Sequence, residues 1–398
     1  MGCAHSGEEV LGAPKQAGVD EVEVVAAGDF HVDHIVYDKL GSGSFGAVYG
    51  AHKARNCNRN ADRQLAVKVV DLRDEVSRNR GEWGTKCRLD SRWYMTYRNE
   101  VHALRKVAGH ENTCQIFGKY MQGGLAYILM ERCDRTLHHA LDRLPALNEA
   151  VLRPYFAGML KGLSFVHLRG LMHRDVKPSN FMCSGANDTV KLCDFGMAKC
   201  FMVEDHASCV GLCGTAAYMA PEILAESFYG PKVDIWALGC TVYVLCFGRF
   251  PYKPDRVSCK GMKQAILAGT PAPSFAPAEG PAGVSPQIVQ WMQTMLARSP
   301  DCRPTCFDAT IDFEALSSRS ASTTCLQPML RAAKRAGAFG TVSEGRSSRG
   351  VVDFRVRELQ ALQHPMQQQE TCQLAVPASE ASTEPGSSPS GSKQAESP

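Results

Sequence analysis

The stretch LMHRDVKPSNFMC (Leu171–Cys183) decides the fold. It sets six side chains in a fixed order, namely His173, Arg174, Asp175, Lys177, Pro178 and Asn180. Six specified residues in this order arise by chance on the order of once in 10⁷ or more positions. The array therefore marks a functional site, and the motifs on both sides of it indicate the chemistry.

Further motifs follow the array along the chain. KLCDFGMAK (Lys191–Lys199) contains Asp194, Phe195 and Gly196. The motifs after it are GTAAYMAPE with Thr215 and Glu222, KVDIWALGC with Asp234 and Trp236, and DCRPT with Arg303. Each one adds specified residues in a specified order, so together they are far more specific than any single motif.

A glycine-rich turn lies upstream, in IVYDKLGSGSFGAVYGAHK (Ile35–Lys53). Apolar residues alternate before Gly41 and after Gly46, which predicts two strands joined by a tight turn. Gly41, Gly43 and Gly46 allow backbone N–H groups to approach a polyphosphate. The turn runs into a strand and not into a helix, which argues against a dinucleotide-binding fold.

A lysine stands in the middle of the apolar strand LAVKVVD (Leu65–Asp71). Lys68 is either an edge residue whose ammonium reaches solvent or an inward residue that faces phosphates. An inward ammonium needs an anion, and Glu100 is the main candidate because YRNEVHALRKVAG has one apolar helical face. Glu75 and Glu82 are the alternatives, but they lie in a polar insert without such a face.

The composition is that of a globular chain. Its 398 residues are 44% hydrophobic and 8% aromatic, which is enough for a sizeable core. A net charge of +3 gives no indication of a nucleic-acid partner. The longest apolar run, Ile235–Phe247, is too short to span a bilayer and predicts a buried helix.

Cysteines are numerous but scattered. The seventeen cysteines include no C-x-x-C pair, so we expect no zinc site. The first thirty residues contain no apolar segment typical of a secretory signal. We therefore expect a reducing compartment and free thiols that pack as small hydrophobic side chains.

Composition shifts divide the chain into three regions. Residues 1–33 show little periodicity, so we expect a flexible leader, and 34–312 contain the strong strand and helix patterns. From 313 to 398 the chain is rich in Ser, Gln and Pro, and we expect it to be largely disordered. Within it, 351–363 is either a docking helix or a transient one. For the polar insert 71–96 we favour a solvated loop over contact with a membrane or substrate.

Together these motifs resemble the eukaryotic protein kinase family. The resemblance covers 34–312 and implies an α+β, two-lobed fold. A small lobe (34–132) would hold an antiparallel sheet and the Glu100 helix, and a larger, mainly helical lobe (133–312) would follow. ATP would bind between the lobes with Mg²⁺, and the substrates would be proteins with hydroxyl side chains.

The resemblance also implies a role for each matched residue. Asp175 would accept the proton of the substrate hydroxyl, and Lys177 would neutralise charge on the transferred phosphoryl group. Lys68 would hold the ATP phosphates, with Glu100 fixing it. The Mg²⁺ ligands would be Asn180 and Asp194. The other ATP contacts would be Leu40, Gly41, Ser42, Gly43, Ser44, Phe45, Gly46, Val48, Ala66, Met130, Glu131 and Cys133. Two further matches would have structural roles. Asp234 would hold the backbone of the catalytic loop (His173–Asn180), and Arg303 would pair with Glu222.

The catalytic loop and the Gly214-Thr215 pair look like the serine/threonine branch of the family, with dual specificity as the alternative. Arg174 precedes Asp175, and such an arginine often needs a phosphate to neutralise it. Ser208 is the one hydroxyl residue between Gly196 and Gly214, so it is the expected phosphosite. We expect Thr215 to contact Asp175 and Lys177 more readily than to take phosphate.

Three cysteines near these motifs leave alternatives open. Cys193, directly before Asp194, would line the ATP pocket either as a reactive thiol or as a small packing residue. Cys209 and Cys213 lie close together in the sequence, and we favour packing or idle thiols over a redox switch for them.

The chain begins MGCAHS, which fits a myristoylation signal on Gly2. One myristoyl chain binds membranes only marginally, so stable anchoring needs a second signal. Lys15 is the sole lysine or arginine in the first thirty residues, which leaves palmitoylation of Cys3 as that second signal. We therefore predict an enzyme on a cytosol-facing membrane.

Three functions remain to be compared. The first is an active serine/threonine kinase. The second is a pseudokinase, but the lysine, the base and the metal ligands that such proteins usually lack are all present here. The third is a membrane-tethered scaffold, which is compatible with the first.

Overall fold

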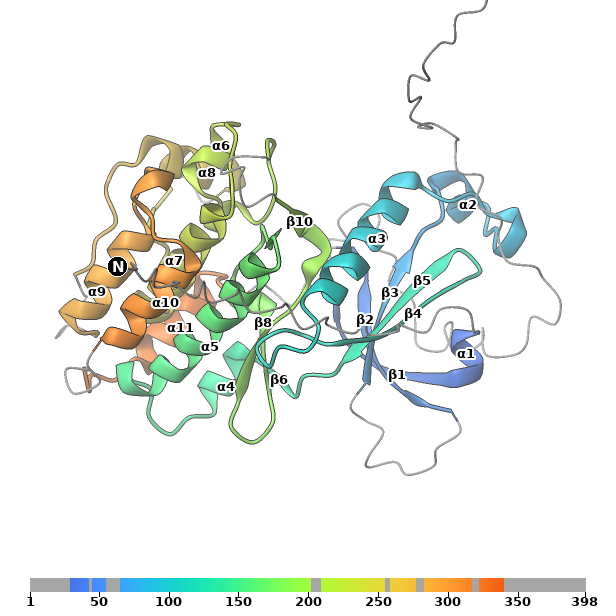
Figure 1. The fold of residues 1–398 in the computed structure, drawn as a ribbon, viewed down its shortest axis with the longest axis horizontal. Coiled ribbons are helices and arrows are strands. Elements are labelled where there is room, and N and C mark those ends of the chain that lie inside the picture. The colour runs from blue at the N-terminus through green and yellow to red at the C-terminus, as the bar shows by residue number, and fades with distance from the viewer. Residues whose placement is uncertain are drawn as a thin grey trace, which may run out of the picture.

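The structure, a computed structural model, describes residues 29–42, 45–54, 65–201, 209–254, 258–276, 283–316 and 322–339. A lobe built around a sheet packs beside a larger, mainly helical lobe (Figure 1). This confirms the predicted α+β, two-lobed fold. The predicted leader residues 1–28, the glycine-turn residues Gly43 and Ser44, the phosphosite Ser208 and the segment 351–363 lie outside the described residues.

The small lobe contains a five-stranded antiparallel sheet in the order β1-β2-β3-β5-β4. The turn between β1 and β2 brings Gly46 against β3, and a Cβ built there would lie 2.4 Å from the Val69 carbonyl oxygen. Only glycine fits at that approach. The strands are β1 (His34–Ser42), β2 (Ala47–Lys53), β3 (Leu65–Asp71), β4 (Ile116–Gln122) and β5 (Leu125–Glu131).

A short helix, α1 (Phe30–Asp33), covers one side of this sheet. Asp29 caps it by accepting a 2.9 Å hydrogen bond from the His31 N–H. Phe30 is fully buried, and its ring stacks on Tyr127 of β5 with centroids 4.4 Å apart. Residues 29–33, which we assigned to the flexible leader, are thus folded onto the small lobe.

The insert between β3 and α3 (Ser91–Lys106) is folded, where we favoured a solvated loop. It forms α2 (Glu75–Asn79) and a 3₁₀ turn, η1 (Gly84–Lys86). The buried Arg73 donates to Asp71 at 2.8 and 3.0 Å, and its guanidinium lies 3.4 Å from the ring centroid of Trp83. These contacts hold the polar insert in its folded form although it has no apolar helical face.

The large lobe is organised around α7 (Lys232–Phe247), whose residues from Val233 to Phe247 are all buried. A helix that is apolar on every side belongs inside a core, which confirms the burial predicted for Ile235–Phe247. The surrounding helices are α4 (Leu137–Asp142), α5 (Glu149–Leu168), α6 (Pro221–Leu224), α8 (Cys259–Ala268), α9 (Pro286–Met295) and α10 (Cys306–Ala315). Short strands and 3₁₀ turns connect them: β6 (Arg135–Thr136), β7 (Leu171–Met172), η2 (Pro178–Asn180), β8 (Phe181–Ser184), β9 (Thr189–Leu192), η3 (Phe195–Met197), β10 (Lys199–Cys200), η4 (Ala216–Tyr218) and η5 (Pro300–Cys302).

The folded chain continues past residue 312, where we expected a largely disordered tail. α11 (Gln327–Arg335) packs on α7 and α4 through the buried Leu330. The Tyr218 hydroxyl donates a 2.9 Å hydrogen bond to the Ala338 carbonyl oxygen. The buried apolar residues of this segment are Leu326, Leu330, Ala333 and Ala338. They are too few to give a recognisable helical pattern in a polar tail.

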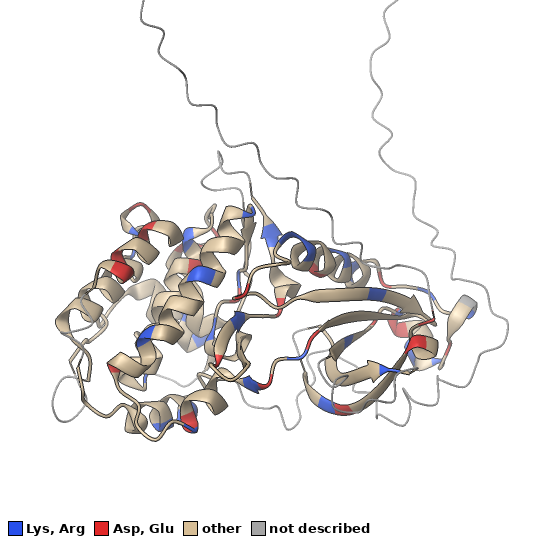
Figure 2. Ribbon diagram, turned by 60° about the horizontal axis from the view of Figure 1, so that its bottom comes forward, with Lys and Arg blue, Asp and Glu red and all other residues tan. Residues whose placement is uncertain are grey.

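One hydrophobic cluster joins the two lobes. It includes Val101 and Leu104 of α3 together with Leu163 of α5 and Phe181 of β8. A second cluster fills the other side of the sheet, around Phe30. Lysine, arginine and acidic residues are interspersed along both lobes (Figure 2). In the described part of the chain, no helix is both long and apolar enough to cross a membrane.

Candidate active site

A buried ion-pair network links β3, α3 and the Asp194 turn. Lys68 Nζ lies 2.6 Å from Glu100 Oε1 and 2.8 Å from Asp194 Oδ1. The Lys68 and Glu100 side chains are almost inaccessible and that of Asp194 is 19% exposed, so a buried ammonium faces two carboxylates. The alternatives do not reach it, because Glu75 is exposed and Glu82 pairs with Arg80.

Burial and charge act in opposite directions on the pKa values of this network. Burial alone would lower the pKa of Lys68, but Asp194 and Glu100 outweigh it and raise that pKa. Burial would raise the pKa of Asp194, and Lys68 lowers it to about 2. For Glu100, burial and the nearby Asp194 raise the pKa more than Lys68 lowers it. One ammonium thus lies between two carboxylates, an arrangement that favours a further cation beside Asp194.

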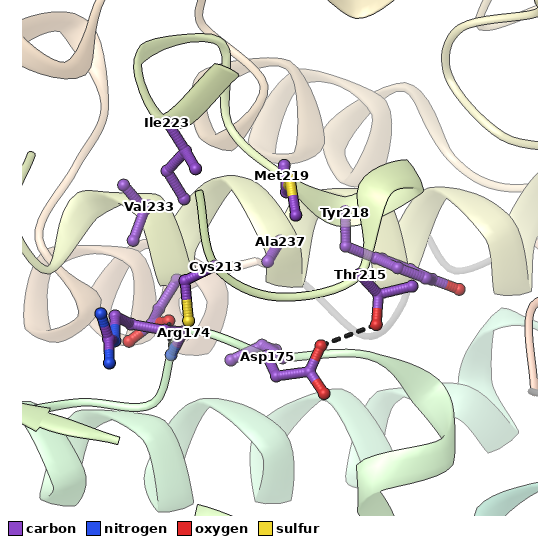
Figure 3. Close-up of a pocket in the computed structure, with 11 residues that line it drawn as sticks. Arg174, Asp175, Cys213, Thr215, Tyr218, Met219, Ile223, Val233 and Ala237 are labelled. Carbon is purple, nitrogen blue, oxygen red and sulfur yellow. Dashed lines mark hydrogen bonds between the residues drawn. The ribbon is translucent and has the colours of Figure 1, made fainter. Parts of the chain in front are cut away.

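The catalytic loop fixes Asp175 through both carboxylate oxygens. Its Oδ1 accepts a 2.7 Å hydrogen bond from Thr215 Oγ1 (Figure 3). Its Oδ2 accepts from Lys177 Nζ at 2.6 Å and from Asn180 Nδ2 at 3.2 Å. Lys177 Nζ also donates to Thr215 Oγ1 at 2.8 Å, so the expected contacts of Thr215 with Asp175 and Lys177 are present. The carboxylate is thus oriented before any substrate arrives.

Buried Asp234 of α7 holds the backbone of the same loop. Its Oδ2 accepts from the His173 N–H and its Oδ1 from the Arg174 N–H, both at 2.8 Å. His167 Nε2 lies 2.9 Å from Oδ2, a contact that nothing in the sequence pattern indicated. Arg174 adopts a positive φ of 64°, an unfavourable conformation that such anchoring stabilises.

The chain from Asp194 to Glu222 is called the activation segment below. A small pocket lies between its end, residues 213–219, and the catalytic loop (Figure 3). Arg174, Asp175, Cys213 and Thr215 line it. Gly214 has a φ of +95°, and a Cβ there would meet the Arg174 carbonyl oxygen at 2.4 Å. Arg174 itself donates to the Met197 carbonyl oxygen at 2.8 Å. The activation segment is therefore packed directly on the catalytic loop.

The sheet places the expected adenine contacts on one face. Val48 is opposite Lys68 in the β2–β3 register, and Met130 is opposite Ala66 in the β3–β5 register. Because Ala66 and Lys68 are two positions apart, all four side chains share a face of the sheet. Leu40 is exposed and lies at an irregularity of the β1–β2 pairing, between Lys39 and Gly41. Its contact with a nucleotide stays a prediction, as do those of Gly41, Ser42 and Phe45.

The hinge, which starts at Glu131 at the end of β5, is held by contacts from both lobes. The Glu131 N–H donates to the Gln115 carbonyl oxygen at 2.9 Å, and the Glu131 carboxylate lies 3.1 Å from Lys191 Nζ. The sequence patterns did not single out Gln115 or Lys191. Of the two hinge residues expected to bind adenine, Glu131 has its N–H engaged by Gln115 and its carbonyl oxygen 3.8 Å from Cys114 Sγ. Cys133 lies two residues further along.

The remaining structural pair has the expected geometry. Arg303 is 2% exposed and donates to both carboxylate oxygens of Glu222, at 2.6 and 2.8 Å. This bidentate contact ties the end of the activation segment to the loop before α10.

Phe195 is fully buried and packs edge-on against His173, with ring centroids 5.1 Å apart.

The donors present suit Mg²⁺. Asp194 supplies a carboxylate, and Asn180 uses its amide nitrogen for Asp175, which leaves Oδ1 as a ligand atom. Mg²⁺ commonly takes one or two protein oxygens and completes its shell with phosphates and water. Within the described ranges, no group of three or more His, Cys, Asp or Glu residues is arranged to hold a metal by itself.

Comparisons with known proteins agree with this geometry. The family model described as "Protein kinase domain" matches residues 35–312. A hormonally up-regulated neu tumor-associated kinase homolog A from Xenopus laevis is 27% identical over 274 residues, which is 68% of this chain and 36% of that protein. CDPK-related kinase 5 from Arabidopsis thaliana is 30% identical over 239 residues, covering 59% and 36%.

A third relative, mitogen-activated protein kinase kinase kinase 1 from Arabidopsis thaliana, is 34% identical over 216 residues, covering 54% of this chain and 32% of the relative. The chain thus spans about a third of the length of these curated relatives. The matched range contains the ion-pair network, the catalytic loop and the hinge. The chain therefore belongs to the protein kinase family.

Proposed function

We propose that the chain is a serine/threonine protein kinase, which transfers the γ-phosphoryl group of ATP to protein hydroxyls. The observation that carries the proposal is the ordered Asp175 carboxylate, held by Thr215, Lys177 and Asn180 at 2.6 to 3.2 Å. A base fixed in this way can accept a proton from a hydroxyl brought within hydrogen-bond reach. The formed Lys68–Glu100 pair supports the same function.

Each group then has a defined task. Lys68 Nζ binds phosphate oxygens, and Glu100 keeps its ammonium inside the site. Asp175 receives the hydroxyl proton, while Lys177 next to it offsets negative charge on the phosphoryl group. Asp194 and Asn180 would hold Mg²⁺, which would neutralise charge on the phosphates. Such a reaction depends mainly on positioning and electrostatics.

Phosphate transfer from labelled ATP to a generic serine- and threonine-containing substrate tests this proposal. Asp175→Asn should lower the rate by at least about 10²-fold, the usual contribution of a positioned base. Asp312→Asn changes the same side chain on the exposed surface of α10 and is the matched control. Equal rates for wild type and Asp175→Asn would contradict the catalytic assignment and favour a pseudokinase or a scaffold.

Phosphoamino-acid analysis of the same product separates the substrate classes. Phosphoserine and phosphothreonine alone support the serine/threonine assignment, whereas phosphotyrosine in addition supports dual specificity. Mass spectrometry of the purified chain, with and without ATP, tests Ser208 as a phosphosite. A phosphate on Ser208 would place a negative charge in the segment that packs on Arg174.

We further propose that the chain is tethered to a cytosol-facing membrane through myristate on Gly2 and palmitate on Cys3. Support comes from the sequence alone, in the MGCAHS start and the scarcity of nearby cations. Gly2→Ala should shift the protein to the soluble fraction, and Cys3→Ser should weaken its retention. Cys302→Ser, an exposed thiol elsewhere, is the control. Wild-type partitioning of both N-terminal variants would refute the tether.

A further inference from the structure

An exposed surface lies where α3 passes the strand β4. Lys119 and Met121 of β4 are two positions apart, so their side chains share one face of the sheet. This is the face toward α3, because Lys119 is opposite Ile128, which belongs to the same hydrophobic cluster as Val101 of α3. Met121 is 37% exposed, and Met95 of α3 is 48% exposed. Apolar side chains are thus left open to solvent on both elements.

The same surface is positively charged. Arg98 and Arg105 lie on the side of α3 that carries Met95, three and ten positions further along. Burial and the nearby guanidinium groups of Arg105 and Arg98 lower the pKa of Lys119. Within the described ranges, no acidic side chain offsets the charge of Lys119. We call the side chains of Met95, Arg98, Arg105, Lys119 and Met121 the α3–β4 surface.

The backbone of β4 is also open to a further strand. In the order β1-β2-β3-β5-β4, β4 is at the end of the sheet and has β5 as its one neighbour among the described strands. An edge strand presents a row of backbone N–H and C=O groups, to which an extended segment can add. A segment that adds here and also meets the α3–β4 surface should carry acidic and apolar side chains.

The leader of this chain contains such a segment. VDEVEVV (Val19–Val25) consists of three acidic residues and four valines, without a cation. In a strand, Glu21 and Glu23 would lie on one face, and Val22 and Val24 on the other. This alternation lets the acidic side chains face the cations of the α3–β4 surface while the two valines face the opposite side of the sheet.

The leader also enters the fold beside β4. Phe30 of α1 packs edge-on against Tyr120 of β4, with ring centroids 5.4 Å apart, and α1 lies on the side of the sheet opposite α3 (Figure 1). Val25 precedes Phe30 by five positions, so it lies within about 18 Å of that contact. The tail segment 351–363 is a poorer candidate, because it begins twelve positions after Phe339, which packs on α4 of the large lobe.

We propose that Val19–Val25 adds to the edge of β4 as a further strand of the sheet. Glu21 and Glu23 then face Lys119 on the α3–β4 surface. Opposite charges at neighbouring cross-strand positions and new backbone hydrogen bonds stabilise the pairing. Because α3 also carries Glu100, the leader rests against the helix that positions Lys68. The contact itself does not depend on the proposed kinase function.

Chemical crosslinking of the purified full chain tests which side chains meet. A carbodiimide joins a carboxylate to a lysine amine in direct contact, with loss of one water. Mass spectrometry after digestion should find, in the monomer, a peptide that contains Lys119 linked to one that contains Glu21 or Glu23. Lys119→Arg keeps the charge but removes the reactive amine, so this link should disappear in that variant.

Amide hydrogen exchange tests the added strand. Peptides from β4 should exchange at least about tenfold more slowly in wild type than in the double variant Glu21→Lys/Glu23→Lys, because the leader protects edge amides only while it is paired. Glu8→Lys/Glu9→Lys makes the same charge change elsewhere in the leader and is the matched control. Val22→Pro removes a backbone N–H and should also release the strand, whereas Val10→Pro should behave like wild type.

Other occupants of the surface would give different links. A link from Lys119 to Asp353 or Glu358 would place the tail there, and a link found only in a covalent dimer would place a second copy there. Either result, or no link from Lys119 to the leader, would overturn the proposal. Equal exchange of β4 in wild type and Val22→Pro would exclude the added strand. A chain that passes both tests but transfers no phosphate would refute the proposed function and leave the docked leader standing.

Discussion

Thr215 Oγ1 donates to Asp175 Oδ1 at 2.7 Å and accepts from Lys177 Nζ at 2.8 Å. One hydroxyl of the activation segment thus touches both the expected base and the expected phosphate-neutralising lysine. The orientation of Asp175 consequently depends on whether this segment is in place. The hydroxyl is engaged in two hydrogen bonds, which opposes its use as a phosphoacceptor in this conformation.

Replacing Thr215 tests this dependence. Thr215→Val keeps the shape but removes the hydroxyl, so kcat should fall roughly tenfold to hundredfold, the equivalent of one lost hydrogen bond to a charged group. Thr215→Ser keeps the hydroxyl and should retain most of the activity. Steady-state kinetics with ATP and a peptide substrate give kcat and KM for both. Similar kcat values for the two variants would show that the hydroxyl does not orient the base.

Acid should weaken the contribution of Asp194 to stability. Its pKa falls from the ordinary value of 3.8 to about 2 in the folded chain. The carboxylate therefore stabilises the fold at any pH at which it is ionised in both the folded and the unfolded chain. This contribution, on the order of 2 kcal/mol at neutral pH, disappears gradually as the pH drops from about 5 to about 2.

Urea unfolding of wild type and Asp194→Asn across this pH range measures the effect. The difference between their free energies of unfolding should be largest at pH 7 and about half as large near pH 3. Asp312→Asn, which removes an exposed carboxylate, should show no such trend. A difference that stays constant with pH would mean that ionisation of Asp194 contributes nothing.

Asp234→Ala should destabilise the chain and nearly abolish transfer. The change leaves the His173 and Arg174 N–H groups without their acceptor, and each buried unsatisfied group costs about 1–3 kcal/mol. Thermal unfolding and transfer assays should therefore both report a loss. Asp312→Ala on the surface should stay within about 0.5 kcal/mol of wild type. Normal activity in Asp234→Ala would show that the loop keeps its shape without this anchor.

Leu330→Ala tests whether α11 is part of the large lobe. Leu330 is 1% exposed, and removing such a side chain from a packed core costs about 2–5 kcal/mol. Arg331→Ala, one residue further along on the exposed side of the helix, is the matched control. Denaturant unfolding of the two variants gives the comparison. An unchanged midpoint for Leu330→Ala would mean that α11 detaches from the lobe in solution.

The two-lobed fold could be predicted from the sequence because each motif places specified residues in a fixed order along the chain. The partner of Lys68 could be chosen because the segment around Glu100 has an apolar helical face and those around Glu75 and Glu82 do not. Contacts made by residues outside the motifs left no such signal. The contact between His167 and Asp234, for example, depends on how α5 and α7 meet in space.

Local composition was misleading in two places. The insert is polar, yet the Arg73–Trp83 stack and the Asp71–Arg73 pair fold it. The segment around α11 has few apolar residues, but Leu326 and Leu330 are buried in the main hydrophobic cluster, which forms only when the helices assemble. Specific pairs stabilise the insert and packing on other helices stabilises α11, so periodicity within either segment carries little information about it.

The shared hydrophobic cluster has a consequence for how the molecule comes apart. Because Val101 and Leu104 belong to the same cluster as Leu163 and Phe181, α3 cannot separate from the large lobe without exposing part of the main core. The helix that carries Glu100 should therefore unfold cooperatively with α5 and β8, and the outer side of the sheet around Phe30 should open independently. Amide hydrogen exchange should then group α3 with the large lobe and the outer side of the sheet by itself. The small lobe would be one unit of the architecture but would not unfold as one unit.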